Sequence, residues 1–420
     1  MVRSLLKMTP PAATTIGEQP SSARVEPPRR WALGSETAFW LVAGMLFVLL
    51  LASGAPAPLY RVYQVEWHFS ETTLTEVFAV YAVVLLVTLL FCGSLSDYVG
   101  RKPLIAGGLL FGAAACGVFL VAGGVGALYV ARSLQGVSVG LATGALGAAL
   151  LELEPEGRGR APVVTSAAPT AGLAVGALGA SVLVQYGPDR TQLIWWLLLA
   201  VFLLAAAAVL AIREPGHRRR GALASLRPRV AVAREARGAF LIALPCLVAV
   251  WALGGLYLSL GPSLAGQLAH SSNVVWGGIV ILLLPGVGAM ATVAFRNANA
   301  SAAMLAGCGA LIVGAAVTFA AVATSTFWAF LLGTAIAGVG FGPGFTGAYR
   351  IAVAPATPEQ RAGLIASIFT VSYLAFSLPA VIAGVAATHY GLRDTALVYC
   401  VGVALLVTAA AGMLRRVPVR

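Results

Sequence analysis

Two charged side chains stand inside apolar stretches of this sequence, and both are candidates for moving protons. Arg132 lies in the apolar run 127–151, and Glu76 lies near the start of the run 74–92. An ionisable group inside a lipid-embedded helix is costly and is by default a functional candidate. The nominal depths of the two residues are similar, so we expect them to pair. Burial favours a neutral carboxyl and a nearby cation favours a charged one, so Glu76 can change protonation as the site opens.

Each of these residues also has a plainer interpretation. Arg132 can extend its stem along the helix and place its charge at the near membrane surface. Glu76 can be a hydrated acid that the helix dipole favours near an N-terminus. For each residue, the sequence alone does not decide between the functional and the plainer interpretation.

A short polar turn between two apolar runs has the spacing Gly-x-Leu-x-Asp-x-x-Gly-Arg-Lys. A plain cytoplasmic turn explains its two cations, which face the anionic leaflet, but it does not explain the spacing of the other residues. Glu152 ends a later run on the same side, so we expect it to join the acid and arginine of the turn, although it can also be an ordinary hydrated helix-end acid. The spaced residues of the turn are Gly93, Asp97, Gly100, Arg101 and Lys102.

Two further runs carry small residues at helical spacing. In the first, Gln135, Gly136 and Gly140 share one helical face with Arg132. In the second, small residues recur every four positions, which favours close helix packing and marks candidate packing and hinge positions. Packing alone explains most of this second pattern. The candidates of the second run are Pro169, Gly172 and Gly176.

The turn and the Arg-x-x-Gln-Gly-x-x-x-Gly string resemble sequence motifs of the major facilitator superfamily. The resemblance implies that the turn belongs to a latch that ties two helix bundles together in the outward-facing state, and that Arg132 is linked to proton movement. Residues 168–179 resemble the antiporter motif of that family only in part, because Ala168 and Leu173 replace two of its glycines. The implied fold is an all-α membrane protein with twelve transmembrane helices in two pseudo-symmetric six-helix bundles.

The composition independently indicates a membrane protein. Of the 420 residues 59% are hydrophobic and 10% are charged, whereas soluble domains average about 25% charged. Apolar runs recur at the length of a membrane-spanning helix. The twelve expected spans are 37–57, 74–92, 104–122, 127–151, 162–185, 190–212, 239–261, 273–295, 301–323, 326–348, 362–388 and 394–414.

The distribution of cations predicts the topology. With twelve spans and an inside N-terminus, 23 of the 27 basic residues lie on the inside, which by the positive-inside rule places both termini in the cytoplasm. The net charge of +12 is therefore no sign of nucleic-acid binding. We expect a multi-pass protein of a bacterial cell membrane.

Three matches between the halves suggest a duplicated six-helix unit. Ser53-Gly-Ala-Pro56 corresponds to Ser259-Leu-Gly-Pro262, the glycines of 136–140 correspond to those of 338–342, and Pro169 corresponds to Pro379. The predicted organisation is as follows: a disordered cytoplasmic tail 1–35, a first bundle 36–212, a basic linker 213–238, a second bundle 239–414 and a tail 415–420.

Polar and aromatic side chains inside the spans are candidates for lining a substrate cavity, although such aromatics are more often core or interface residues. The second half has no acid well inside any span, so we expect a neutral or anionic amphipathic molecule rather than an organic cation. The cavity candidates are Gln135, Tyr257, Phe345, Ser372 and Tyr373.

The sequence thus predicts a proton-coupled secondary transporter that exports drugs or small amphipathic metabolites by alternating access. The alternatives are a proton-coupled importer of a sugar or organic acid and, remotely, a membrane-embedded transferase. The five cysteines and four histidines are scattered and predict neither a disulfide framework nor a metal site. We expect no enzyme activity and no cofactor, and as partners a small molecule, protons and the bilayer, with the monomer as the functional form.

Overall fold

The computed structural model describes residues 33–154, 159–214, 222–228 and 230–416, and these residues form helices and no strands. Most of the predicted N-terminal tail, part of the linker and the last four residues lie outside the described residues. The elements, in chain order, are α1 Ser35–Gly54, α2 Pro56–Trp67, α3 Glu71–Cys92, α4 Ser96–Val99, α5 Arg101–Leu120, α6 Val125–Leu153, α7 Ala161–Tyr186, α8 Leu193–Ala208, the 3₁₀ helix η1 Val209–Ala211, α9 Ala222–Ser225, α10 Arg234–Ser259, α11 Gly261–Leu268, α12 Val275–Ala294, α13 Ala300–Ala323, α14 Phe327–Val353, α15 Pro358–Tyr390 and α16 Leu392–Arg416.

Twelve helical segments among the described residues are long and apolar enough to cross a membrane, and they coincide with the twelve runs of the sequence. Large hydrophobic side chains point outward along them, among them Leu110, Trp196, Leu204 and Ile382. In water such a surface would aggregate, whereas in a bilayer it faces lipid. The predicted fold class is therefore confirmed.

The first span is longer than predicted because the chain continues as a helix past Pro56. The segment Ser35–Trp67 consists of α1 and α2, which meet at Ala55. A proline in the first turn of a helix costs no hydrogen bond, so α2 begins there instead of ending the helical region. The second half repeats this arrangement, since α10 meets α11 at Leu260 and Pro262 lies in the first turn of α11.

The glycine pairs of the two halves also occupy equivalent places. A Cβ on Gly136 would meet the backbone oxygen of Tyr81 on α3, and a Cβ on Gly338 would meet the backbone oxygen of Leu284 on α12. The fourth span thus packs closely on the second, and the tenth packs in the same way on the eighth. Pro169 and Pro379 both lie inside helices, α7 and α15.

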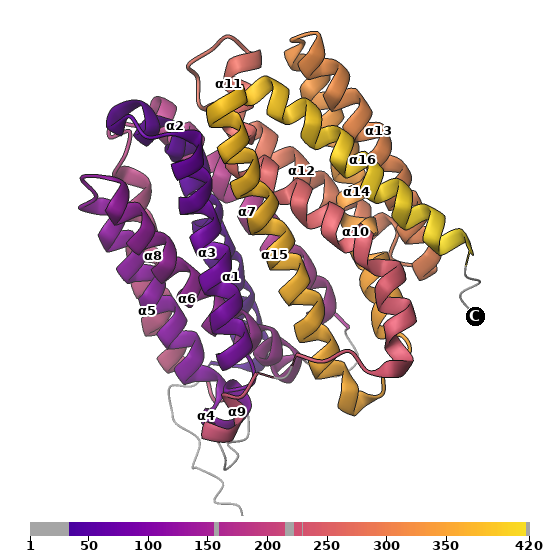
Figure 1. Ribbon diagram of the computed structural model, residues 1–420. Coiled ribbons are helices and arrows are strands. Elements are labelled where there is room, and N and C mark those ends of the chain that lie inside the picture. Colours follow the sequence, from indigo (N-terminus) through magenta and orange to yellow (C-terminus); the bar gives the residue numbers. More distant parts are fainter. Residues whose placement is uncertain (1–32, 155–158, 215–221, 229, 417–420) are drawn as a thin grey trace, which may run out of the picture. The chain divides into compact units, whose positions relative to one another are not determined.

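The buried apolar residues form two clusters. One consists mainly of residues between Ala38 and Ile212, and the other of residues between Ala236 and Leu414. In Figure 1 the helices of the first half run from indigo to magenta and those of the second half from pink to yellow, with α15 beside α3. The predicted division into two bundles agrees with this pattern and remains a prediction.

The two halves meet along a seam, which we define as the contacts of α3 with α15 and of α7 with α12. Thr72 Oγ1 lies 2.9 Å from Thr388 Oγ1, and the Thr72 amide donates to the same oxygen at 3.2 Å. Gln185 accepts a hydrogen bond from the Val274 amide at 3.2 Å. These bonds lie where α3 begins and α7 and α15 end, so the seam is fastened at the end of the molecule opposite to α4.

Candidate functional site

Arg101, the first residue of α5, is the centre of an ion-pair cluster. Its Nη1 donates to Asp97 Oδ1 at 2.5 Å and to Ser96 Oγ at 2.7 Å. Its Nη2 donates to Glu152 Oε1 at 2.9 Å, and its Nε lies 3.4 Å from the other oxygen of the same carboxylate. The contact that the sequence predicted between Arg101 and Glu152 is therefore present, from the end of α6.

Glu214 completes this cluster and was missed by the sequence reasoning. Its carboxylate accepts from the backbone amides of Arg101 at 2.6 Å and Lys102 at 3.2 Å, so it satisfies free donors at the start of α5. Gly100 has φ +102, and a Cβ there would lie 2.8 Å from Glu214 Oε2. The glycine of the turn thus allows both the left-handed bend and the close approach of the acid.

The basic side chain of Lys102 also joins the turn to the end of the first half. Its Nζ donates to the backbone oxygen of Ile212 at 2.6 Å and of Leu210 at 3.3 Å. Together with Glu152 and Glu214, this lysine ties two segments to the turn, the end of α6 and residues 210–214. The role of these residues as a conformational latch stays a prediction, because the contacts described here join residues between 96 and 214 and do not reach the second half.

We expect Glu152→Ala to shift the balance between the inward- and outward-facing states. The substitution removes the bidentate partner of Arg101 and leaves the half-exposed Asp97 as its ion-pair partner, at a cost of about 1 kcal/mol after allowance for solvent. Crosslinking between the halves measures the shift. Glu66→Ala, an exposed acid at the other end of the first half, is the matched control. An unchanged crosslinking pattern in Glu152→Ala would refute the latch role.

Arg132 lies deep inside the first half, with 2% of its surface exposed. Its Nη1 donates to Gln135 Oε1 at 2.7 Å and to the backbone oxygen of Ser53 at 3.3 Å. The ring of Tyr81 covers the guanidinium, with Cζ 4.1 Å from the ring centroid. The arginine therefore does not reach the membrane surface, and the interpretation that it extends outward is wrong for this structure.

The structure does not bring Glu76 and Arg132 together. Glu76 is exposed and accepts a hydrogen bond from the Tyr129 hydroxyl at 2.7 Å. The reason is the rotation of α3, which turns Tyr81 rather than Glu76 toward Arg132. The expected ion pair is absent from the described contacts, and the role of each residue in proton coupling remains a prediction.

Glu71, which the sequence reasoning did not single out, is the acid that lies at the seam. Its Oε2 is buried and has no hydrogen-bond partner within the described residues. Arg61 and Gln64 of α2 interact with its carboxyl group. The adjacent Thr72 forms the hydrogen bond to Thr388 of α15. Glu71 is therefore a candidate for proton coupling because it lies next to this contact between the halves, and nothing in its sequence context indicates it.

An aromatic group lies where the two halves meet. The Trp251 ring is 5.8 Å from Phe345, 5.1 Å from Tyr373 and 5.6 Å from Phe376, measured between centroids. Phe376 in turn lies 4.8 Å from Phe78 of the first half. Trp251 packs against both apolar clusters. Two predicted cavity residues, Phe345 and Tyr373, thus belong to this aromatic group, which is contributed by α10, α14, α15 and α3.

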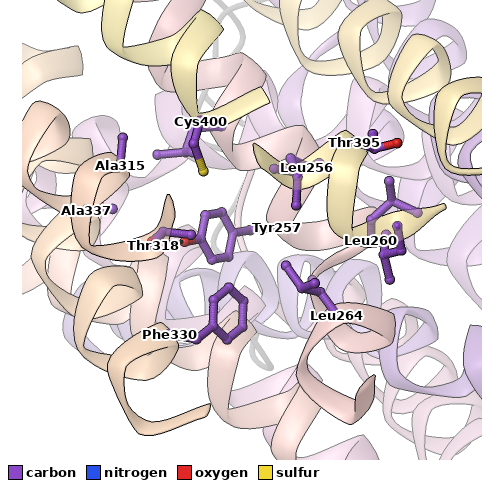
Figure 2. Close-up of a pocket in the computed structure, with 14 residues that line it drawn as sticks. Leu256, Tyr257, Leu260, Leu264, Ala315, Thr318, Phe330, Ala337, Thr395 and Cys400 are labelled. Carbon is purple, nitrogen blue, oxygen red and sulfur yellow. Dashed lines mark hydrogen bonds between the residues drawn. The ribbon is translucent and has the colours of Figure 1, made fainter. Parts of the chain in front are cut away.

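The other three cavity candidates lie apart from that group. Gln135 binds Arg132 and donates to the backbone oxygen of Ala52 at 3.0 Å. Ser372 is fully buried, and its hydroxyl has no partner within the described residues. Tyr257 lines a different pocket, which helices of the second half alone enclose (Figure 2).

The pocket of Figure 2 offers little to a polar substrate. Its walls are mostly carbon, and the hydroxyl groups of Tyr257 and Thr318 bind each other at 3.2 Å. The Thr395 hydroxyl donates to the backbone oxygen of Gly391 at 2.9 Å. Since these hydroxyls are already satisfied, the pocket is a feature of second-half packing and Tyr257 lies away from the junction of the halves.

The small residues of α7 lie close to the backbone of α1. A Cβ on Gly172 or Gly176 would overlap the backbone of α1 at Phe47 or Leu51. A Cβ on Gly140 would lie 2.6 Å from Thr88 Cβ on α3. The hinge role of these glycines and of Pro169 remains a prediction.

The described residues thus contain twelve apolar helices, a charged turn and an aromatic group between two halves, an arrangement typical of membrane transporters. A family model described as Major Facilitator Superfamily matches residues 41–299, more than half of the chain. The chain belongs to this family of transporters. No curated protein sequence matches the chain.

Solved structures share this fold at low sequence identity. A bacterial homologue of the human lysosomal transporter Spinster, inward-facing and unoccupied, has a TM-score of 0.73 and 13% identity over 91% of this chain and 97% of that one. The nucleoside transporter NupG has a TM-score of 0.70 and 12% identity over 90% and 99% of the two chains. The human organic anion transporter MFSD10 has a TM-score of 0.64 and 14% identity over 92% and 100%.

Proposed function

We propose that this protein is a proton-coupled secondary transporter that exports small amphipathic molecules by alternating access. The observation that supports it is the seam. The hydrogen bonds observed between the halves gather at one end, while the aromatic group of Trp251 lies farther along the same junction. Breaking the seam and closing the opposite end would expose the aromatic group first to one side of the membrane and then to the other.

The orientation follows from charge. Among the described residues, the end that holds Arg101 also holds most of the cations, which favours its placement in the cytoplasm. With the seam closed at the outer end, the structure then corresponds to an inward-facing state. The similar Spinster homologue is inward-facing and unoccupied in its structure, which supports the same assignment.

Proton coupling rests on carboxylates that change environment as the seam opens. The Oε2 atom of Glu71 is buried beside the seam, and Glu76 lies five residues further along α3, bound to Tyr129. Opening the seam would hydrate Glu71 and favour its charged form. We assign Glu71 to the same proton-coupling role as Glu76, and the two are tested separately.

Cells that lack their own exporters and produce this protein should retain less 1-naphthoate, an amphipathic carboxylate, than cells without it. A protonophore should abolish the difference. We expect Glu71→Gln to abolish it too, because its side chain is next to the seam, and Glu76→Gln to weaken it several-fold. If cells with the protein contain more 1-naphthoate than cells without it, the protein imports the compound and the assigned direction is wrong. Unchanged export in both variants would refute the role of Glu71 and Glu76 in proton coupling.

A further inference from the structure

Arg132 presents one edge of its guanidinium without a partner. The Nη1 atom is engaged by Gln135 and Ser53, whereas Nε is buried and makes no hydrogen bond within the described residues. Nη2 likewise makes no hydrogen bond there. The free edge therefore consists of two adjacent N–H groups. This edge has the two-donor geometry that binds a carboxylate in a bidentate manner.

The charge of Arg132 also has no carboxylate partner among the described residues. Its observed contacts are an amide, a backbone oxygen and the Tyr81 ring, and no carboxylate is among them. A buried charge without a counter-ion is costly, and an aromatic ring recovers about 1–2 kcal/mol of that cost. An anion placed against the free edge would restore the balance.

Tyr60 supplies a third unpaired donor nearby. Its side chain is 1% exposed, and its hydroxyl has no hydrogen-bond partner within the described residues. The Tyr60 phenol lies within electrostatic range of Arg132 and Tyr81. Buried polar groups are normally satisfied. Two buried polar groups on α2 and α6, each without a hydrogen-bond partner among the described residues, therefore point to a missing acceptor.

We infer that Arg132, Tyr60 and Gln135 form a binding site for a monovalent anion, which we assign to the carboxylate of the transported molecule. Arg132 supplies the two-donor edge, Tyr60 a hydroxyl donor, and Gln135 holds the guanidinium in place. The inference rests on the proposed function because it names the substrate class of the same transporter.

The aromatic group gives the rest of such a molecule a place. The Tyr81 ring covers the Arg132 guanidinium, and Tyr81 also lies within electrostatic range of Tyr373. Tyr373 is in contact with Trp251. A ligand with a carboxylate at Arg132 and an aromatic body beyond Tyr81 would thus lie along the junction of the halves. The expected ligand is an aromatic monocarboxylate.

The test is equilibrium binding to the purified full-length protein, measured as the rise in unfolding temperature with ligand concentration. The probes are 1-naphthoate, its neutral amide 1-naphthamide, and chloride, at constant ionic strength set with sulfate. We expect naphthoate to raise the unfolding temperature and the amide not to. Arg132→Gln should abolish the shift, and Tyr60→Phe should weaken naphthoate binding about tenfold, as the loss of one hydrogen bond to a charged group does.

Two further variants keep the result interpretable. Arg132→Lys retains the charge and loses the two-donor edge, so it should lose most naphthoate binding even where Arg132→Gln fails to fold. Tyr257→Phe changes a buried tyrosine whose hydroxyl already has partners in the second half, and it should bind like the unaltered protein.

The outcomes separate the two proposals. A naphthoate shift that Arg132→Lys, Arg132→Gln and Tyr60→Phe leave unchanged would overturn the site, as would equal shifts by naphthoate and its amide. A chloride shift that equals or exceeds that of naphthoate would support the anion chemistry and assign it to a free inorganic ion. Binding that depends on Arg132 without any transport of naphthoate would leave the site intact and contradict the proposed function.

Discussion

A disulfide between Thr72→Cys and Thr388→Cys should lock the seam and abolish transport. The two hydroxyl oxygens are 2.9 Å apart, so sulfur atoms at these positions come within reach of a bond of about 2.05 Å with small side-chain rotations. A closed seam cannot pass the substrate to the outer side. We expect export of 1-naphthoate to fall to the level of cells without the protein under oxidising conditions and to recover with a reductant.

Each single cysteine variant is a control, because it changes the same residue without a partner. The native cysteines are free, and Cys92, the least buried of them, should be replaced by serine to prevent other crosslinks. Hydrogen exchange of residues 71–80 provides a readout that needs no substrate, and it should slow in the oxidised double variant. Full transport by a protein shown to be crosslinked would mean that the seam does not open during the cycle.

Gly176→Ala and Gly179→Ala should change stability in opposite directions. Both glycines lie in α7. A Cβ on Gly176 would overlap the backbone of Leu51 in α1, whereas a Cβ on Gly179 would have no neighbouring atom within 4 Å. Overpacking costs about 1–3 kcal/mol. Replacing an open helical glycine with alanine contributes up to about 1 kcal/mol of stability. Unfolding temperature and yield of purified protein measure both effects.

The same pair of variants tests whether helix packing or helix flexibility matters at Gly176. If flexibility alone mattered, both alanines would stiffen α7 and have similar effects on transport. If close packing on α1 matters, only Gly176→Ala loses stability. Equal unfolding temperatures for the two variants would contradict the close contact of α1 and α7.

Some contacts of the Arg101 cluster follow from the spacing of residues in the sequence, and others do not. The turn 93–104 is short, so its Asp97 and Arg101 had to lie close together, and Glu152 follows from the helix that ends on the same side. Glu214 enters from the chain after the sixth span, more than a hundred residues away. No local pattern indicates that this acid returns to the start of α5, because its position depends on how α8 packs against α5.

The case of Glu76 shows that the depth of a residue along its helix is not enough to predict its contacts. Residues at equal depth meet only if both helices turn them toward each other, and one residue corresponds to about 100° of rotation. In α3 this rotation places Tyr81 over Arg132 and Glu76 beside Tyr129, and Glu71 beside α2 near the seam. The rotation of α3 follows from its close packing against glycines of α6 such as Gly136. This packing is a property of the tertiary structure.

The sequence by itself determined the number of spans, the charged turn and the family. Each helix must match the bilayer on its own, so the length of its apolar run can be read locally, and the motifs depend only on the spacing of nearby residues. The tertiary structure alone decided which polar groups meet. It surrounded Arg132 with Tyr81, Gln135 and Ser53. It left the Tyr60 hydroxyl without a partner among the described residues, and it joined α3 to α15 at Thr72. Those contacts join residues far apart in the chain, and they depend on helix rotation and close backbone approach, which only the packed molecule fixes.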